Sequence, residues 1–376
     1  MKFIIKTTHE KQLQNVSNGQ STVEDGMSLQ FTRDCWFLTG PTASGKSAVG
    51  VALARRIDAE IVSLDSMALY RRMDIGTAKP TEAQRRIVPH HLIDVIEPWE
   101  EYSLASYVAE ARRIAEQIAG RGKLVLFVGG TPLYLKGLLR GIFQGPPADW
   151  TFRRRLADDA RQNGGDWLHR RLAEIDPASA ARLHPNDARR LIRALEVYEK
   201  TGRPISELQR QFDVGRPADE CRAFVLDWPR EELCNRIDRR VDKMFAAGLV
   251  GEVRRLLALA KDKRPATAVA GENSEVLPPP RPQSRGVLGA VENPPPLSRT
   301  ASQAVGYREV IEHLEGIRGL AETVELVKRH TRQLAKRQTT WFRSLSECRF
   351  IPVSDGLDAV EVAERIVPLA RRQDAR

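Results

Sequence analysis

The sequence predicts an α/β protein in which a parallel sheet is flanked by helices and interrupted by a helical insertion. Short apolar runs alternate with helical periodicity from about Asp34 to Gly141. One of these runs leads into a glycine-rich loop that opens a helix, and the alternation stops between about 152 and 202 before a strand returns. In a sheet wound in this way, ligands gather at the carboxyl ends of the strands.

The first half of the chain predicts four strands. Apolar runs at 35–38, 61–64, 91–95 and 123–128 have strand length, and the last is nearly all apolar, as in the centre of a parallel sheet. A helix is expected at 104–119, and another begins at Thr131-Pro132, because proline suits the first turn of a helix.

The second half completes the predicted sheet. A strand is expected at 222–227 and a long helix at 230–260. Helices at 303–313 and 321–344, a strand at 349–353 and a closing helix follow.

These patterns divide the chain into six parts. The Lys261–Thr300 stretch holds 8 of the 22 prolines and few residues that could build a core, so we expect an unstructured loop there. The predicted division is a disordered extension (1–30), the first part of the core (31–150), a helical insertion (151–205), the core continued (206–260), the proline-rich loop (261–300) and a C-terminal helical part of the core (301–376).

Composition limits the classes of function. The formal net charge of +10 favours a polyanionic partner, with nucleic acid first and an anionic membrane surface second. No apolar run reaches the length of a membrane span, so no membrane partner is expected. The four cysteines form no CxxC pair, which argues against structural zinc and disulfides and favours the cytoplasm.

The glycine-rich loop matches the phosphate-binding pattern GxxxxGK[ST]. Its glycines allow backbone amides to close around phosphate oxygens at a helix N-terminus. Lys46 would reach the outer phosphate and Ser47 would hold Mg²⁺. The eight residues of this phosphate loop are Gly40, Pro41, Thr42, Ala43, Ser44, Gly45, Lys46 and Ser47. By itself the loop suggests ATP, but it does not identify the molecule that carries the phosphates.

Two polar residues follow predicted strands beside this loop. A kinase with such a loop usually has an acid at the end of a neighbouring strand, but the 123–128 strand ends in Gly129-Gly130-Thr131. The available acid is Asp65, which could act as a metal ligand, a general base or a helix cap. Thr131 could face the same crevice or cap a helix.

Other polar residues have weaker interpretations. Lys79, in a turn-rich segment, could add a phosphate contact. His90 and His91 point to opposite sides of a strand, so structural roles are expected and a shared metal is not.

The segment 328–343 is basic and contains no acid. Arg329, Arg332, Lys336 and Arg343 are spaced to lie near one helical face, with Trp341 interleaved. A solvated basic face and a surface for single-stranded nucleic acid explain this pattern about equally well.

Seven segments of the chain together match a known family. They are GPTASGKS (40–47), SLDSMALYRRMDIGTAKP (63–80), PHHLIDVIEP (89–98), VGGTPLYLKGLLRG (128–141), RRLIRALEVYEKTGRP (189–204), AVGYREV (304–310) and RQLAKRQTTWFR (332–343). These segments resemble the tRNA dimethylallyltransferase (tRNA isopentenyltransferase) family, and the resemblance runs from about Phe37 to Arg343. No Cys/His zinc finger follows Arg343, so the bacterial type is the better match.

The resemblance implies transfer of a dimethylallyl group from dimethylallyl diphosphate to N6 of the adenosine on the 3′ side of the anticodon, in tRNAs that read codons starting with U. The phosphate loop would then hold the diphosphate of the prenyl donor, with Mg²⁺ at Ser47. Asp65 would accept the proton of the amino group and Thr131 would position the reacting centre. Arg240, in preference to Arg236, would contact the diphosphate.

The resemblance also implies tRNA contacts, with the helical insertion gripping the anticodon loop and the protein acting as a monomer. The implied contact residues are Asp65, Ser66, Met67, Ala68, Thr131, Arg153, Arg189, Arg190, Arg193, Gln303, Gly306, Tyr307, Arg308, Lys336, Arg337, Gln338, Trp341 and Arg343.

Three alternatives remain open from the sequence. An adenylate isopentenyltransferase would use the same loop and Asp65 on free AMP, ADP or ATP, but it would need neither the basic helix nor the insertion. A small-molecule kinase would place ATP in the loop. An RNA-binding module with a relic loop is the third.

Overall fold

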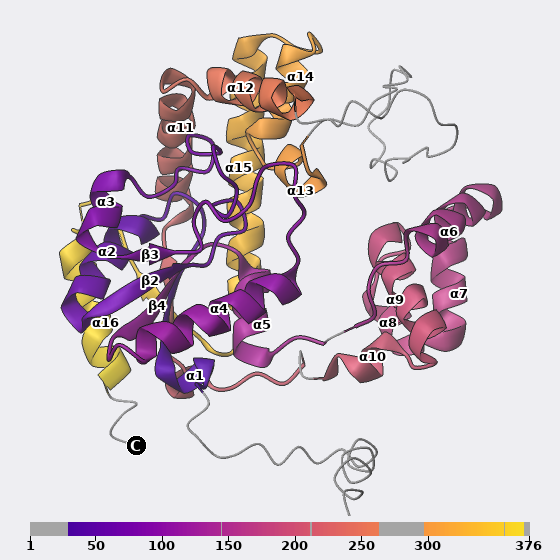
Figure 1. Cartoon of the computed structure of the whole chain (residues 1–376), viewed down its shortest axis with the longest axis horizontal. Coiled ribbons are helices and arrows are strands. Elements are labelled where there is room, and N and C mark those ends of the chain that lie inside the picture. The colour runs from indigo at the N-terminus through magenta and orange to yellow at the C-terminus, as the bar shows by residue number, and fades with distance from the viewer. Residues whose placement is uncertain (1–28, 144, 211–212, 263–296, 357, 372–376) are drawn as a thin grey trace, which may run out of the picture.

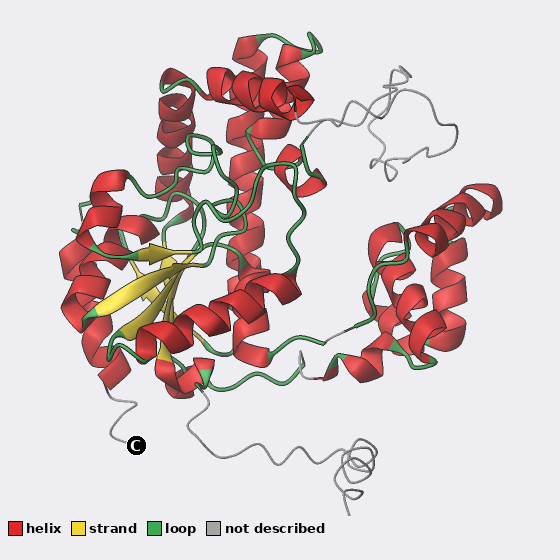
Figure 2. Cartoon of the chain, viewed as in Figure 1, coloured by secondary structure: helices red, strands yellow, loops and turns green. Residues whose placement is uncertain are grey.

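The computed structural model describes residues 29–143, 145–210, 213–262, 297–356 and 358–371. Within them lies a six-stranded sheet with the order β3-β2-β4-β1-β5-β6, in which each strand runs parallel to its neighbours. Helices cover both faces of this sheet (Figures 1 and 2). The predicted fold class is confirmed.

The strands agree with the expected positions except at one edge. Their bounds are β1 Cys35–Thr39, β2 Ala59–Ser63, β3 His90–His91, β4 Leu124–Gly129, β5 Ala223–Asp227 and β6 Cys348–Pro352. The prediction of a strand over 91–95 is wrong, because Leu92 and Asp94 adopt left-handed backbone angles (φ +57° and +58°) that end β3 after two residues. Strand β4 lies between β1 and β2, near the centre, as its apolar sequence predicts.

Two apolar layers enclose the sheet. On one face, Phe37 and Phe127 stack at a centroid distance of 5.0 Å in a cluster that includes Tyr107. On the other face, Leu38 and Leu53 are buried with residues of the C-terminal helix. The covering helices are α1 Phe31–Asp34, α4 Leu104–Ala119 and α5 Pro132–Arg140 for the first layer, and α2 Lys46–Ile57 and α16 Ala359–Arg371 for the second.

A group of helices stands beyond the strand ends of the sheet (Figure 1). The helix predicted over 230–260 is two helices, α11 Arg230–Ala246 and α12 Leu249–Asp262, because Gly248 at φ +96° ends the first. The remaining helices in this part of the core are α3 Glu82–Ile87, α13 Arg299–Ser302, α14 Tyr307–Leu314 and α15 Leu320–Arg343.

The two segments predicted to lack structure lie mostly outside the described residues. Residues 1–28 and 263–296 are not described. The boundary of the predicted loop at 300 is wrong, because Leu297 is buried and the Ser298 side chain caps α13 by accepting from the amide of Ala301.

The helical insertion has a core of its own, which includes Phe152, Leu156, Leu172 and Leu191. It corresponds to the predicted unit at 151–205 and joins the main core through two connecting segments (Figure 1). Its helices are α6 Trp150–Asn163, α7 Trp167–Ile175, α8 Pro177–Arg182, α9 Ala188–Thr201 and α10 Ile205–Leu208, and a 3₁₀ turn at Ala218–Glu220 follows.

The outgoing and returning segments of the insertion meet at its root. Arg140 ends α5 and forms an ion pair with the buried Glu347 at 2.7 Å. Gly215 lies against the same arginine, since a Cβ there would be 2.4 Å from Arg140 Nη2. In the part of the chain that the structure describes, no helix is long and apolar enough to cross a membrane.

Candidate active site

The phosphate loop lies between β1 and α2, as its sequence predicts. Gly40, Ala43 and Gly45 have positive φ angles, which wind the backbone tightly before the helix begins. Lys46 Nζ donates a hydrogen bond of 2.9 Å to the carbonyl of Pro41. Burial, and next the positive charge of Arg240, lower the pKa of Lys46 to about 8. A bound anion would favour the charged form of this lysine.

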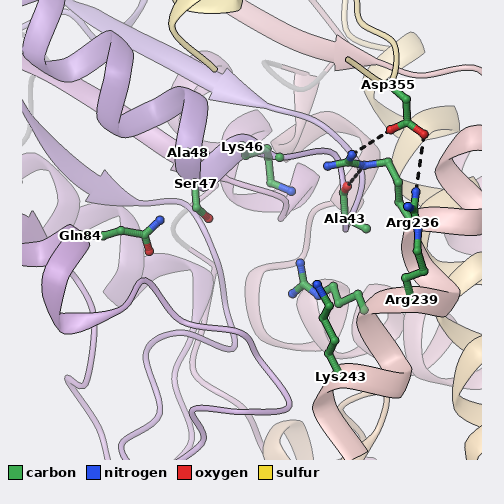
Figure 3. Close-up of a pocket in the computed structure, with 11 residues that line it drawn as sticks. Ala43, Lys46, Ser47, Ala48, Gln84, Arg236, Arg239, Lys243 and Asp355 are labelled. Atoms are coloured by element: carbon green, nitrogen blue, oxygen red, sulfur yellow. Dashed lines mark hydrogen bonds and ion pairs between the residues drawn. The ribbon is translucent and has the colours of Figure 1, made fainter. Parts of the chain in front are cut away.

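A cavity of about 490 Å³ lies in front of the loop (Figure 3). Its charged lining consists of Lys46, four basic residues of α11 and Asp355. Asp355 forms ion pairs with Arg236 at 3.1 Å and with Arg239 at 3.5 Å. The excess of positive charge suits a ligand with several negative charges, such as a diphosphate. The basic residues from α11 are Arg236, Arg239, Arg240 and Lys243.

Arg236 supports the loop. Its Nε donates to the carbonyl of Ala43 at 3.0 Å, and its guanidinium stacks on Trp228 at 4.1 Å. The indole of Trp228 donates to the carbonyl of Ser44 at 2.9 Å. These contacts commit Arg236 to holding the loop backbone.

Arg240 faces the interior of the site. It makes a long hydrogen bond of 3.4 Å to the carbonyl of Thr77, and burial lowers its pKa while the charge of Asp65 raises it. It lines one cavity together with Lys46 of the loop and Asp65. This placement supports the preference for Arg240 over Arg236 as a diphosphate ligand.

A second, narrower cavity of about 90 Å³ connects the loop with Asp65. It shares Lys46, Ser47 and Arg240 with the first cavity and adds Asp65 and Gly130. The cations that face the loop and the acid at the end of β2 therefore line one continuous site. The remaining polar side chains in its lining are Thr42, Ser63, Thr77, Lys79, His90 and Gln338.

Asp65 fixes a turn and lines the site. Its Oδ1 accepts a hydrogen bond of 2.8 Å from the amide of Met67, which fixes the turn after β2. No helix begins at this turn, so Asp65 is not a helix cap. The same carboxylate lines the narrow cavity, and the turn thus fixes its position there.

Thr131 stands beside Asp65 and makes no capping hydrogen bond to α5. Its Oγ1 accepts from the amide of Ser66 at 3.0 Å. Gly129 makes this approach possible, since a Cβ there would lie 2.2 Å from the backbone of Leu64. The ends of β2 and β4 therefore touch, and Thr131 orients the segment that carries Asp65.

Lys79 is not available for the predicted phosphate contact. Its Nζ donates to the carbonyl of Tyr70 and to Asp74 and Asp94 at 2.5, 2.7 and 2.6 Å, and its side chain is 2% exposed. Its buried ammonium group instead links the segments that carry Tyr70, Asp74 and Asp94.

The two adjacent histidines have the structural roles that the sequence predicts. His90 Nδ1 contacts the carbonyl of Val88 at 2.7 Å, and His91 Nε2 contacts Glu60 at 2.7 Å. Within the described residues, no group of three or more His, Cys, Asp or Glu side chains could hold a metal ion.

The basic helix α15 presents two different faces. Lys336, Arg337 and Trp341 are exposed, as the predicted RNA contact requires. Arg332 pairs with Asp238 on α11 at 2.6 Å and so serves packing between helices. Arg343 is exposed and lies 3.7 Å from Asp227.

Gln338 departs from the prediction of a tRNA contact. Its side chain points inward and hydrogen-bonds the phosphate loop and Gly130.

Three other implied tRNA contacts are buried. Tyr307 is fully buried and its Oη donates to Glu252 at 2.6 Å, so the structure assigns it a supporting role. Gly306 begins α14 with φ +96°, and Ala68 is 6% exposed. In this structure their side chains do not form an RNA-facing surface.

The other implied contacts on the core reach the surface to different degrees. Ser66 and Met67 are half-buried beside Asp65, and Gln303 is exposed. Arg308 is half-buried and contacts Glu309 and His330, each at 3.0 Å.

The arginines of the insertion also divide into two groups. Arg153 forms two hydrogen bonds, of 2.8 and 2.7 Å, to the fully buried Glu196, and Arg193 also contacts that carboxylate. Arg153 therefore joins α6 to α9, whereas Arg193 contacts the carboxylate from within α9. Arg189 and Arg190 are exposed, and Arg190 pairs with Asp187 at 2.8 Å.

The sequence interpretation missed three basic residues. Arg239 and Lys243 are signalled by the spacing of basic residues along α11, which repeats at positions i, i+3, i+4 and i+7. Arg299 is exposed on α13, within the stretch predicted as a loop, and burial and then the charge of Arg189 lower its pKa. The positive charge of Arg189 on the insertion is thus felt at Arg299 on the core, and a bound anion would favour the charged form of Arg299.

Two family models match the chain. One, described as isopentenyl transferase, matches residues 33–89, and one described as IPP transferase matches residues 68–345. The chain belongs to the IPP transferase family. Membership of this family makes the protein a transferase and overturns the kinase alternative.

Two bacterial relatives named tRNA dimethylallyltransferase are similar to most of this chain. The chain is 45% identical over 324 residues to a tRNA dimethylallyltransferase of Rhodopirellula baltica, covering 84% of this chain and 87% of the relative. It is 44% identical over 321 residues to the tRNA dimethylallyltransferase of Geobacter metallireducens, covering 85% of this chain and 93% of the relative.

Solved structures of IPP transferases agree with the fold. A tRNA isopentenylpyrophosphate transferase from Bacillus halodurans is 32% identical with a TM-score of 0.59, covering 91% of this chain and 99% of that chain. A eukaryotic dimethylallyltransferase acting on tRNA is 25% identical with a TM-score of 0.69, covering 92% of this chain and 80% of that chain.

Proposed function

We propose that the protein transfers a dimethylallyl group from dimethylallyl diphosphate to N6 of the adenosine 3′ to the anticodon, in tRNAs that read codons starting with U. One observation carries the proposal: the narrow cavity places Lys46 and Arg240 on the same path as Asp65. The names of the relatives support tRNA, and not free adenylate, as the acceptor.

The donor binds with its diphosphate in the phosphate loop. Loop amides, Lys46 and Arg240 surround the phosphates, and Arg239 and Lys243 add positive charge at the wider cavity. The prenyl carbon C1 then lies towards the narrow cavity and Asp65.

Mg²⁺ fits this site as an ion carried with the diphosphate. Ser47 lines both cavities at the start of α2, and its hydroxyl would be one ligand of the ion. Oxygen ligands of the substrate and water would complete the site, as is usual for Mg²⁺ at phosphate sites. When bound, the ion neutralises part of the diphosphate charge.

The residues of this site can carry out the transfer in one displacement. The N6 amine attacks C1 of the prenyl group, the C1–O bond breaks, and its electron pair leaves with the diphosphate. The N6 proton passes to Asp65, whose turn Thr131 holds through the Ser66 amide. Lys46 and Arg240 stabilise the charge that grows on the leaving group, which is the larger effect.

The acceptor adenine must leave the anticodon-loop stack to reach Asp65. Exposed Lys336, Arg337 and Trp341 on α15 are suited to phosphates and to an unstacked base. Arg189 and Arg299 extend this positive surface to the insertion. We propose that the protein acts as a monomer in the cytoplasm.

A labelled-donor assay tests the proposal. The protein is incubated with labelled dimethylallyl diphosphate and Mg²⁺, together with either unmodified tRNA or AMP. We expect label in tRNA, at the adenosine 3′ to the anticodon after nuclease digestion, and about 10²–10⁴-fold slower labelling with Asp65→Asn. Label in AMP but not in tRNA would contradict the proposal.

A further inference from the structure

Gln338 connects the two halves of the site. Its Oε1 accepts a hydrogen bond of 2.9 Å from the amide of Thr42, in the phosphate loop. Its Nε2 donates a hydrogen bond of 2.6 Å to the carbonyl of Gly130, at the exit of β4. One amide side chain thus bridges backbone groups from segments far apart in the sequence.

The surroundings of Gln338 leave little room for another arrangement. A Cβ at position 130 would lie 2.9 Å from Gln338 Nε2 and 3.4 Å from Lys46 Nζ. Lys46 in turn donates to Pro41, the residue before Thr42. The loop and the β4 exit therefore contact the same side chain, and Lys46 lies beside the same glycine. Thr131 follows Gly130 directly.

We propose that Gln338 is a positioning residue, which holds the phosphate loop against the β4 exit and so sets the separation between the bound diphosphate and Asp65. The inference rests on the proposed function, because it takes the ligand of the loop to be a diphosphate. It replaces the expectation that Gln338 contacts tRNA: the outer face of α15 presents Lys336 and Arg337, and the inner face orders the donor site.

This role requires both a hydrogen-bond acceptor and a hydrogen-bond donor in the side chain at position 338. Gln338→Ala removes both hydrogen bonds. Gln338→Glu keeps an acceptor for Thr42 but sets a carboxylate oxygen against the Gly130 carbonyl, and it adds negative charge beside the diphosphate. Gln338→Met retains the volume of the side chain without either hydrogen bond.

Binding measurements on the full chain test this role without requiring turnover. Calorimetry gives the Kd of inorganic diphosphate with Mg²⁺, and a separate titration gives the Kd of an anticodon stem-loop. Amide hydrogen exchange of residues 40–45 reports the order of the loop. Thr340→Ala is the matched control, because Thr340 is exposed on the same helix and its Oγ1 bonds only within α15, to Lys336.

We expect Gln338→Ala to weaken diphosphate binding about tenfold, as the loss of two hydrogen bonds predicts. Gln338→Glu should weaken it further, while stem-loop affinity stays within about threefold. Exchange at Thr42 should accelerate in both variants and not in Thr340→Ala. If Gln338→Ala does not fold, Gln338→Met provides the same comparison.

Unchanged diphosphate affinity and unchanged exchange at Thr42 would overturn the proposal. A loss of stem-loop affinity with normal diphosphate binding would overturn it as well, in favour of direct RNA contact. If the wild type binds diphosphate as expected but transfers no prenyl group to tRNA, the proposed function fails while the role of Gln338 stands.

Discussion

The hydroxyl of Tyr307 donates a hydrogen bond of 2.6 Å to the carboxylate of Glu252, and both residues are buried. The same carboxylate accepts from the amides of Asp74, Ile75 and Gly76. Burial, and next the charge of Glu252, raise the pKa of Tyr307, so the phenol remains a donor at neutral pH. This pair anchors the loop whose next residue, Thr77, contacts Arg240.

Tyr307→Phe is expected to lower the free energy of unfolding by about 1–3 kcal/mol, because a buried carboxylate loses one partner. Denaturant titration measures the change. Glu252→Ala should cost more, because three backbone amides lose their acceptor. Stem-loop affinity at a temperature where the variant is folded should be unaffected by Tyr307→Phe. A loss of affinity at unchanged stability would return Tyr307 to the RNA surface.

Lys46→Met should weaken diphosphate binding without removing it, because Arg240 and the loop amides remain, and it should raise thermal stability. The pKa of Lys46 is about 8 in the folded protein, below its ordinary value of 10.5, so the unfolded chain holds its proton more tightly. The resulting cost to the folded state is complete below pH 8 and disappears as pH rises towards 10.5. The gain in Tm should therefore be larger at pH 7 than at pH 10. An equal gain at both pH values would contradict this electrostatic origin.

The affinity for diphosphate should fall as pH rises through about 8, because the free site then loses the charge on Lys46. Bound diphosphate raises that pKa, so binding near pH 8.5 should take up a proton. Calorimetry in buffers of different ionisation enthalpy measures the uptake. The Lys46→Met variant corrects for protons bound by the diphosphate itself. Identical uptake in the variant would exclude the lysine.

Asp65→Asn should reduce prenyl transfer by about 10²–10⁴-fold, as the loss of a general base predicts. The amide can still accept from Met67, so the turn should remain intact. Rapid-quench assays with saturating donor and tRNA measure the chemical step. The Kd of tRNA and of diphosphate should change little. A comparable loss of tRNA binding would make Asp65 a structural residue.

Arg299→Gln should weaken tRNA binding and reduce the salt dependence of that binding by about one phosphate contact. Arg189→Gln, on the insertion, should have the same effect. Fluorescence anisotropy from 50 to 200 mM salt measures both. Arg55, exposed on α2 and not assigned to any ligand, provides a control substitution to Gln. Equal losses of tRNA affinity in all three variants would show that Arg299 and Arg189 act only through nonspecific positive charge.

The phosphate loop, Asp65 and Thr131 could be predicted because each is defined locally, by a short pattern at a strand end. Strand β3 could not, since the left-handed angles at Leu92 and Asp94 depend on contacts made elsewhere. The hydrogen bond from the Asp94 amide to the carbonyl of Ala68 is one of these.

The presence of a residue in a sequence motif does not determine which way its side chain points. Tyr307 and Gln338 lie in segments that resemble RNA-binding segments of the family, yet both point inward, towards Glu252 and the phosphate loop. Helical spacing could have predicted Arg239 and Lys243. Only the assembled structure brings Arg299 near Arg189.

The meeting of Arg140 and Gly215 at the root of the insertion has an evolutionary consequence. The chain leaves and re-enters the core at one place, and the insertion packs around an apolar cluster of its own. Substitutions in the insertion can therefore accumulate without disturbing the packing of the sheet, the phosphate loop or Asp65, so the two parts of the protein can evolve at different rates.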